Sequence, residues 1–305
     1  MILSAVVLLA QERTDVRSGH ITDRGLTTAD FPRLKPLTPH VYAWEDLHIS
    51  GAGYTTNSLI VVTPEGVLVA DGQGTPDATR KLIAGVAKLT TQPIRYVVIC
   101  SDHGDHTGGN EAFAPGTAFL AHSLSRAMLE KAAAAPDRAP GAPRIVLPTE
   151  TVDDERVLTL GGMEIRIEHL GKAHAGGDLL VDVPSEGVLF LSEIYLHRIF
   201  PSMRTASPTS WIDVLKRARE IPAAIVVPGH GFVDRPDVLR EELGAYHRAL
   251  EAVVAEATRL HAAGLSVDTA ATRANWGEYG AWTARDRNAA IAIRRVYDEI
   301  EGRLR

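Results

Sequence analysis

The sequence predicts a mixed α/β fold, and three observations support that prediction. Short apolar runs rich in β-branched residues, bounded by glycine and proline, recur from residue 41 to residue 227. Segments with apolar residues at helical spacing separate several of these runs. After residue 236 only helical patterns follow. The 305 residues, 45% hydrophobic and 23% charged, are enough for one large domain or two small ones.

The first part of the chain leads into a strand-rich region. Residues 11–36 are polar and contain prolines, which predicts an extended lead-in before a main domain at residues 37–235. We expect an amphipathic helix over Asp77–Leu89, which Pro93 ends. The strands expected here are Val41–Trp44, Ser58–Thr63, Val67–Ala70 and Ile94–Ile99, with residues 54–57 as a turn or loop.

The second part alternates strands and helices and then becomes helical. Gly161-Gly162 predicts a hairpin turn. Residues 236–305 form a predicted helical extension, whose apolar face is a surface for packing on the same domain or for a homodimer. The strands expected here are 119–122, 157–160, 163–169, 179–183, 188–191 and 223–227, and the helices are 123–135, 208–220, 238–262 and 288–304, with a loop at 264–287.

Composition narrows the classes of function. A net charge of −6 gives no basic stripe for nucleic acid. The single cysteine, Cys100, excludes an internal disulfide framework and a cysteine-rich zinc ribbon, so a metal site must use histidine and carboxylate ligands. With nucleic acid excluded as a partner, we expect the protein to bind a small-molecule substrate.

The N-terminal residues 1–10 resemble the apolar part and cleavage end of a signal peptide, without its basic start. This favours a truncated signal segment and a periplasmic or secreted protein. The alternative is a buried first strand or helix in a cytoplasmic protein. The segment is too short to span a bilayer as a helix, and no other stretch is long and apolar enough.

The most informative stretch is the run Cys100–Asn110, CSDHGDHTGGN, directly after a predicted buried strand. Asp102, His103, Asp105 and His106 place two imidazoles and two carboxylates within five residues. Both groups are usual ligands of zinc and related divalent ions. Flanking glycines allow the tight backbone that lets near neighbours point at one centre. The alternative is a polar loop in which Asp105 or Thr107 caps the next helix.

Three later positions repeat the order of strand, ligand-type residue and glycine-rich loop. His174 lies in GKAHAGGD, Glu193 follows the strand VLFL, and His230 ends the run VVPGH. Ligands on loops at strand ends fit a site that a rigid scaffold holds. One such histidine is commonly structural, but the repetition favours a common metal site.

Together SDHGDHTGGN, GKAHAGGD, LFLSE and VPGHG resemble the metallo-β-lactamase-fold superfamily of metallohydrolases, in order and in spacing. The resemblance covers about residues 37–234 and implies a four-layer αββα sandwich with metal at one edge. It implies that His103 and His174 bind the first metal, and that Asp105, His106 and His230 bind the second. Asp71 matches an aspartate that organises the site by hydrogen bonds.

Two departures from the family's His-x-His-x-Asp-His pattern affect the first metal position. Ser101 replaces the first histidine, and a hydroxyl is a poor zinc ligand beside imidazole. The first position then keeps two histidines and would bind metal more weakly, or would need Asp102 or a water to complete it. Glu193 replaces the bridging aspartate and keeps the carboxylate with one more methylene. Three interpretations remain open: a two-metal site, a one-metal site at Asp105, His106 and His230, or a decayed site.

The resemblance implies a zinc-dependent hydrolase with one or two ions, with manganese or iron as alternatives. A metal-activated water would attack a carbonyl or ester-type electrophile, with Asp105 as the catalytic residue that orients the nucleophile or moves its proton. We expect Tyr195, Arg198 and Arg204 to border the substrate pocket. The alternative is a metal- or ligand-binding protein of the same fold with little hydrolytic activity.

Overall fold

The structure is a computed structural model that describes residues 12–304, so the predicted signal segment lies outside the described residues. The strands are β1 Arg33–Pro36, β2 Val41–Leu47, β3 Thr55–Thr63, β4 Gly66–Ala70, β5 Ile94–Ile99, β6 Ala118–Ala121, β7 Glu150–Thr151, β8 Glu155–Leu160, β9 Met163–Glu168, β10 Leu180–Val183, β11 Val188–Leu196 and β12 Ile225–His230. The helices are α1 Pro76–Val86, α2 Gly104–Thr107, α3 Ser123–Ala133, α4 Pro208–Ala218, α5 Pro236–Ala262, α6 Val267–Arg273 and α7 Arg285–Ile300.

The strands form one curled sheet whose two halves face each other. The order is β7-β6-β5-β4-β3-β12-β11-β10-β9-β8, with β2 beside β3 and β1 beside β2. The halves join where β3 meets β12, and His230 opposite Thr56 is their one paired position. A core cluster joins Leu68 and Val98 of one half with Ile167 and Leu189 of the other, so the two inner faces bury each other.

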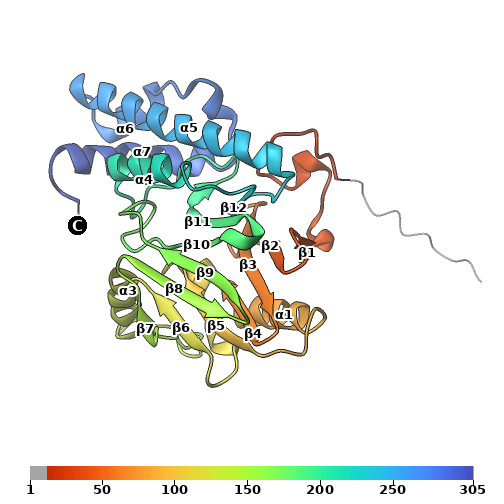
Figure 1. Cartoon of the computed structure of the whole chain (residues 1–305). Helices are drawn as coiled ribbons and strands as arrows, with labels where there is room; N and C mark the ends of the chain where they lie inside the picture. The colour runs from red at the N-terminus through yellow and green to blue at the C-terminus, as the bar shows by residue number, and fades with distance from the viewer. Residues whose placement is uncertain (1–11, 305) are drawn as a thin grey trace, which may run out of the picture.

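Helices cover both outer faces and complete four layers. Helices α1 and α3 lie against one half, at the bottom of Figure 1, and α4, α5 and α7 lie over the other half at the top. In α1, Leu82 and Val86 are buried against the sheet, and the Thr75 side chain caps the helix by accepting from the amide of Ala78. The α/β sandwich predicted from the sequence is therefore confirmed.

Several element boundaries differ from the sequence expectations. Residues 55–57 belong to β3, where the sequence predicted a turn or loop. Their polar side chains hid the strand, but they are buried, and Asn57 donates to the carbonyl groups of Pro228 and Gly231. The lead-in contains β1, and the predicted loop at 264–287 contains α6.

Candidate metal centre

The loops that follow β5 and β9, strand β11 and the end of β12 bring six ligand-type residues to one edge of the sandwich. They form two groups, whose ligand atoms lie within 4.8 Å of one another: Asp105, His106, Glu193 and His230 in one, and His103, His174 and Glu193 in the other. Glu193 belongs to both groups. Every residue that the sequence assigned as a metal ligand is in one of them.

The first group has the spacing of a tetrahedral ligand set. His230 Nε2 lies 3.3 Å from His106 Nε2 and 3.2 Å from both Asp105 Oδ2 and Glu193 Oε1. Zinc–ligand bonds of about 2.0–2.1 Å give tetrahedral edges of about 3.3–3.4 Å. Asp105 Oδ2 is buried and has no hydrogen-bond partner among the described residues, so a carboxylate oxygen is left to meet a cation. These residues fit a divalent metal ion.

The second group gathers around the other oxygen of Glu193. Oε2 of Glu193 lies 2.7 Å from His103 Nδ1 and 3.1 Å from His174 Nδ1. Ser101 Oγ donates a short hydrogen bond to the same oxygen. This group therefore holds two imidazoles and one carboxylate oxygen, with a hydroxyl beside them.

Hydrogen bonds outside the groups fix which imidazole nitrogen faces inward. The ring N–H at Nδ1 of His230 donates to the carbonyl of Thr55 over 2.8 Å, which leaves Nε2 with its lone pair toward the centre. Asp71 accepts from the amide of Cys100 over 2.8 Å and from the hydroxyl of Ser192 over 2.5 Å. Its Oδ2 also lies 3.0 Å from His106 Nδ1, so Asp71 stands behind the ligands as an organising carboxylate.

The electrostatics of the centre favour ionised carboxylates. Burial opposes the charge of Glu193, but His174, His103 and His106 outweigh it and hold the pKa of Glu193 well below its ordinary value. Burial likewise opposes the charge of Asp105, and the charge of His106 outweighs it, so its pKa is also well lowered. Burial opposes the charge of His103, and Glu193 overcomes it and raises the pKa to about 9. The two carboxylates attract cationic groups into the position that a metal ion would take.

Glycines let the ligand loop pack closely on its neighbour. A Cβ at Gly108 would lie 2.4 Å from the carbonyl oxygen of Gly74, and one at Gly109 would lie 2.2 Å from the carbonyl oxygen of Thr75. The amide of Gly109 donates to the carbonyl of Gln73 over 2.8 Å. Only glycine allows this approach, which places the ligands of α2 beside Asp71.

A cavity of about 540 Å³ opens onto both groups. Of the three substrate residues expected from the sequence, Arg204 lines it and two do not. Tyr195 is a correction: its side chain is fully buried in the core, and its hydroxyl donates to the carbonyl of Leu239. Arg198 is also a correction, because both ends of its guanidinium bind the carboxylate of Glu242 on α5.

The remaining sequence candidates lie near the centre in unequal roles. Asp102 belongs to neither ligand group and does not line the cavity; its Oδ1 accepts from the hydroxyl of Ser125. Asp105 and Thr107 do not cap α2, whose N-cap residue, His103, makes no side-chain cap bond. The thiol of Cys100 is buried, and burial raises its pKa well above the ordinary value, so it is not a nucleophile.

The sequence missed the residues that two distant segments add to the cavity. His48, directly after β2, places Nε2 3.3 Å from Asp105 Oδ2. The only sequence signal for it was the same pattern of strand end and following glycine. Arg287, Asn288 and Ile291 reach the cavity from α7, and helical periodicity gave no sign of this.

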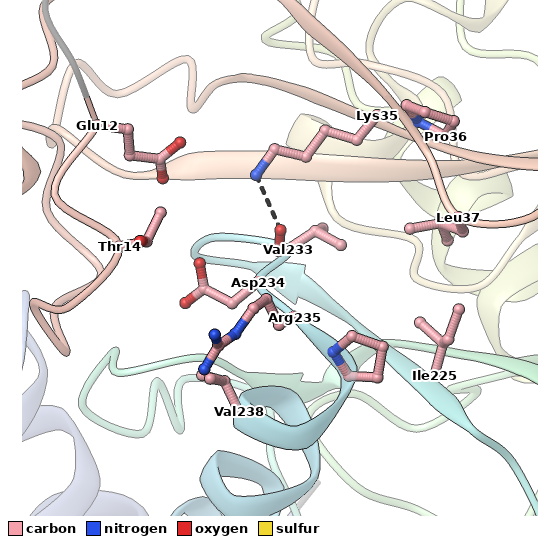
Figure 2. Close-up of a pocket in the computed structure, with 11 residues that line it drawn as sticks. Glu12, Thr14, Lys35, Pro36, Leu37, Ile225, Val233, Asp234, Arg235 and Val238 are labelled. Atoms are coloured by element: carbon pink, nitrogen blue, oxygen red, sulfur yellow. Dashed lines mark hydrogen bonds between the residues drawn. The ribbon is translucent and has the colours of Figure 1, made fainter.

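A second cavity, of about 390 Å³, lies away from the candidate metal centre (Figure 2). It is bounded by Glu12 and Thr14 of the lead-in, Lys35 of β1 and the start of α5. The Lys35 ammonium donates to the carbonyl of Val233 over 2.8 Å. None of its lining residues belongs to either ligand group.

A family profile described as the metallo-beta-lactamase superfamily matches residues 51–230. The chain belongs to this superfamily. The matched region contains all six ligand-type residues but not α7. Some of its relatives are hydrolases by name. Among the described residues, no helix is long and apolar enough to cross a membrane.

Three superfamily relatives show the range of named activities. A linear primary-alkylsulfatase of Pseudomonas sp. is 22% identical over 56% of this chain and 40% of its own length. The α subunit of 2,4-dinitroanisole O-demethylase of Nocardioides sp. is 24% identical over 69% of this chain and 62% of its own. The metallo-beta-lactamase type 2 of Bacillus cereus is 25% identical over 66% of this chain and 77% of its own. The chain thus spans less than two thirds of the first two.

Solved structures of the superfamily share the fold. A metallo-beta-lactamase from Pontibacter korlensis has a TM-score of 0.62 at 19% identity and covers 72% of this chain and 99% of its own. The inverting sec-alkylsulfatase Pisa1 from Pseudomonas sp. has a TM-score of 0.68 at 18% identity and covers 88% of this chain and 50% of its own. Residues 1–235 are only 77% of the 305, so the second likeness extends into the helical extension.

Proposed function

We propose that the protein is a metal-dependent hydrolase that uses zinc at the Asp105, His106, Glu193 and His230 group, with a second ion at the His103 and His174 group. The observation that carries the proposal is the carboxylate of Glu193, which offers one oxygen to each ligand group at the floor of an open cavity. The names of two of the relatives, an alkylsulfatase and a metallo-beta-lactamase, support hydrolysis of an ester-type or lactam bond.

A divalent ion bound at this centre lowers the pKa of water and polarises the electrophile. The chain's own residues do the rest. Asp105 lines the cavity, and its carboxylate would accept a hydrogen bond from the attacking water and orient it toward the electrophile. His48 faces the same carboxylate over 3.3 Å and limits its movement.

The experiment is metal analysis combined with a hydrolysis panel on protein purified without chelator. Wild type should contain at least one zinc per chain and hydrolyse at least one ester, thioester, lactam or sulfate ester. Removal of the metal should abolish that hydrolysis, and zinc should restore it. His230→Ala should lose metal and at least 100-fold in kcat/KM.

His40→Ala is the matched control, because His40 is an exposed histidine that pairs with Glu186 far from the cavity. It should keep the metal content and activity of wild type. Metal binding without hydrolysis of any substrate would support the alternative, a metal- or ligand-binding protein. A chain that takes up no zinc or manganese would overturn the hydrolase and leave a ligand-binding protein without metal.

A further inference from the structure

The cavity contains two guanidinium groups that no carboxylate neutralises. Arg204 and Arg287 line it, and among residues 12–304 no carboxylate oxygen lies within 4.0 Å of either guanidinium. The acidic residues of the lining are Asp105 and Glu193, and both belong to the ligand groups. Once a divalent ion offsets those carboxylates, the charge left for a ligand is positive.

Hydrogen bonds to neighbouring side chains hold the Arg287 guanidinium in place. One end of its guanidinium, Nη2, donates to the hydroxyl of Tyr54 over 2.7 Å, and Nε donates to Oδ1 of Asn288 over 3.2 Å. Asn288 is buried and donates from Nδ2 to the carbonyl of Phe200. Nη1 makes no hydrogen bond to any described residue. A fixed guanidinium with an open end costs little side-chain entropy when it binds an oxyanion.

Tyr54 connects Arg287 to the metal centre. Its ring packs edge-on against His230 with the ring centres 5.6 Å apart, and the Arg287 guanidinium lies 5.7 Å from the centre of the Tyr54 ring. The same aromatic side chain therefore contacts Arg287 and a residue of the first ligand group. Arg287 itself belongs to neither ligand group, so it is free to bind a ligand group.

The rest of the lining is apolar in part. Ile49, Leu196, Ile199 and Ile291 contribute aliphatic surface. Ile49 is 53% exposed and offers its side chain at a loop beside the cavity. A ligand that matches both features carries a negative charge and an apolar chain.

We propose that Arg287, assisted by Arg204, forms an oxyanion subsite that selects amphiphilic anionic substrates for the hydrolase, so this inference rests on the proposed function. The oxyanion is a carboxylate next to an ester bond or the charged oxygens of a sulfate ester. Arg287 is a specificity residue outside the region that the family profile matches. It brings the helical extension into the substrate site.

The test compares matched substrates on wild type, Arg287→Ala, Arg287→Lys and Arg294→Ala. The substrates are the mono-4-nitrophenyl ester of succinic acid, its neutral methyl diester counterpart, and hexyl sulfate. Arg294 is an exposed arginine on the same helix outside the cavity, so it is the matched control. Arg287→Ala should lower kcat/KM roughly 10- to 100-fold for the anions and less than 3-fold for the neutral ester.

The lysine variant should recover part of the loss because it keeps the charge without the fork. Hexyl sulfate and the succinate ester distinguish the two sources of the oxyanion. A wild type that does not prefer either anion, or an Arg287→Ala variant that behaves as Arg294→Ala does, overturns the inference.

A binding measurement separates this inference from the proposed function. Calorimetry with decanoate, decane-1-sulfonate and neutral decanamide needs no turnover. If no substrate is hydrolysed but Arg287→Ala weakens both anions at least 10-fold and leaves decanamide unchanged, the subsite stands and the hydrolase proposal fails. If hydrolysis depends on metal but the anions bind equally to both proteins, the hydrolase stands and the subsite fails.

Discussion

The hydroxyl of Thr205 lies 3.0 Å from Nε2 of His103, and its own proton is donated to the carbonyl of His174 over 3.1 Å. Because Thr205 gives its proton to the carbonyl, it accepts from the imidazole, so His103 carries its proton on Nε2. Nδ1, which donates to Glu193 over 2.7 Å while the ring is protonated, would offer its lone pair to a metal ion that replaces that proton. Arg295 of α7 holds Thr205 by donating to its carbonyl over 3.1 Å, which links the helical extension to the centre.

Thr205→Val should weaken metal binding at the His103 and His174 group about 10-fold, because the imidazole loses the acceptor that fixes its tautomer. Thr205→Ser keeps the hydroxyl and should bind metal as wild type does. Competition of the protein with a zinc chelator measures both. Zinc affinity equal to wild type in the valine variant would contradict the tautomer argument. An equal loss of zinc affinity in both variants would instead indicate a packing effect of the methyl group.

Glu193→Gln should reduce zinc at both positions, because its two oxygens face different ligand groups. His174→Ala should reduce zinc at one position only, since His174 belongs to one group. In a protein that binds two equivalents of zinc, we expect at most a trace in the first variant and one equivalent in the second. Elemental analysis after dialysis measures this. Retention of both equivalents in Glu193→Gln would show that the carboxylate is not shared.

Asp178 clamps the loop that carries His174, because its buried carboxylate accepts from the amides of Ala173 and Ala175 over 2.9–3.1 Å. Asp178→Ala should lower the free energy of unfolding by about 1–3 kcal/mol and weaken zinc binding, since two buried amides lose their acceptor. Asp182→Asn is the control, because Asp182 is buried on β10 outside the site with one oxygen unpaired. Urea unfolding and zinc competition should both distinguish the two variants.

The sequence predicted that these ligand-type residues come together, because strand ends and glycine loops are local features. Each ligand-type residue follows or ends an apolar run, and the rigid sheet brings those ends to one edge. The apolar runs and the helical tail likewise sufficed for the α/β class. Apolar runs did not predict the polar start of β3. Thr55 and Asn57 are polar side chains that are buried because they donate hydrogen bonds to carbonyl groups at the end of β12 and just after it.

The cavity wall was beyond local patterns. Arg198 and Arg204 belong to the same loop, and nothing in their sequence context tells that the first meets Glu242 and the second faces the cavity. Which arginine contacts Glu242 depends on where α5 packs against this loop. Arg287 lies far along the chain from the ligand motif at residues 100–110, and it reaches the cavity only because α7 packs beside the loop after β11. Long-range packing of this kind leaves no periodic signal.

The buried pair of Arg24 and Asp234 anchors the lead-in. Both oxygens of Asp234 accept from the Arg24 guanidinium over 2.6 Å, and the Arg24 side chain is fully buried. Arg24→Ala leaves Asp234 buried without its cation, so we expect the free energy of unfolding at pH 7 to fall by about 3–5 kcal/mol. Arg80→Ala, which breaks an exposed pair with Asp77, should change it by less than about 1 kcal/mol.

The same pair makes stability depend on pH in a defined direction. Burial raises the pKa of Asp234, but the hydrogen bonds from Arg24 outweigh it, and the pKa in the folded protein lies below the ordinary value. Between the folded and unfolded pKa values the unfolded chain binds more protons, so this contribution is complete above about pH 4 and is lost as the pH falls. Urea unfolding of metal-free protein from pH 3 to pH 7 should show a steeper loss below pH 4 in wild type than in Arg24→Ala. Parallel curves would mean that Asp234 titrates independently of Arg24.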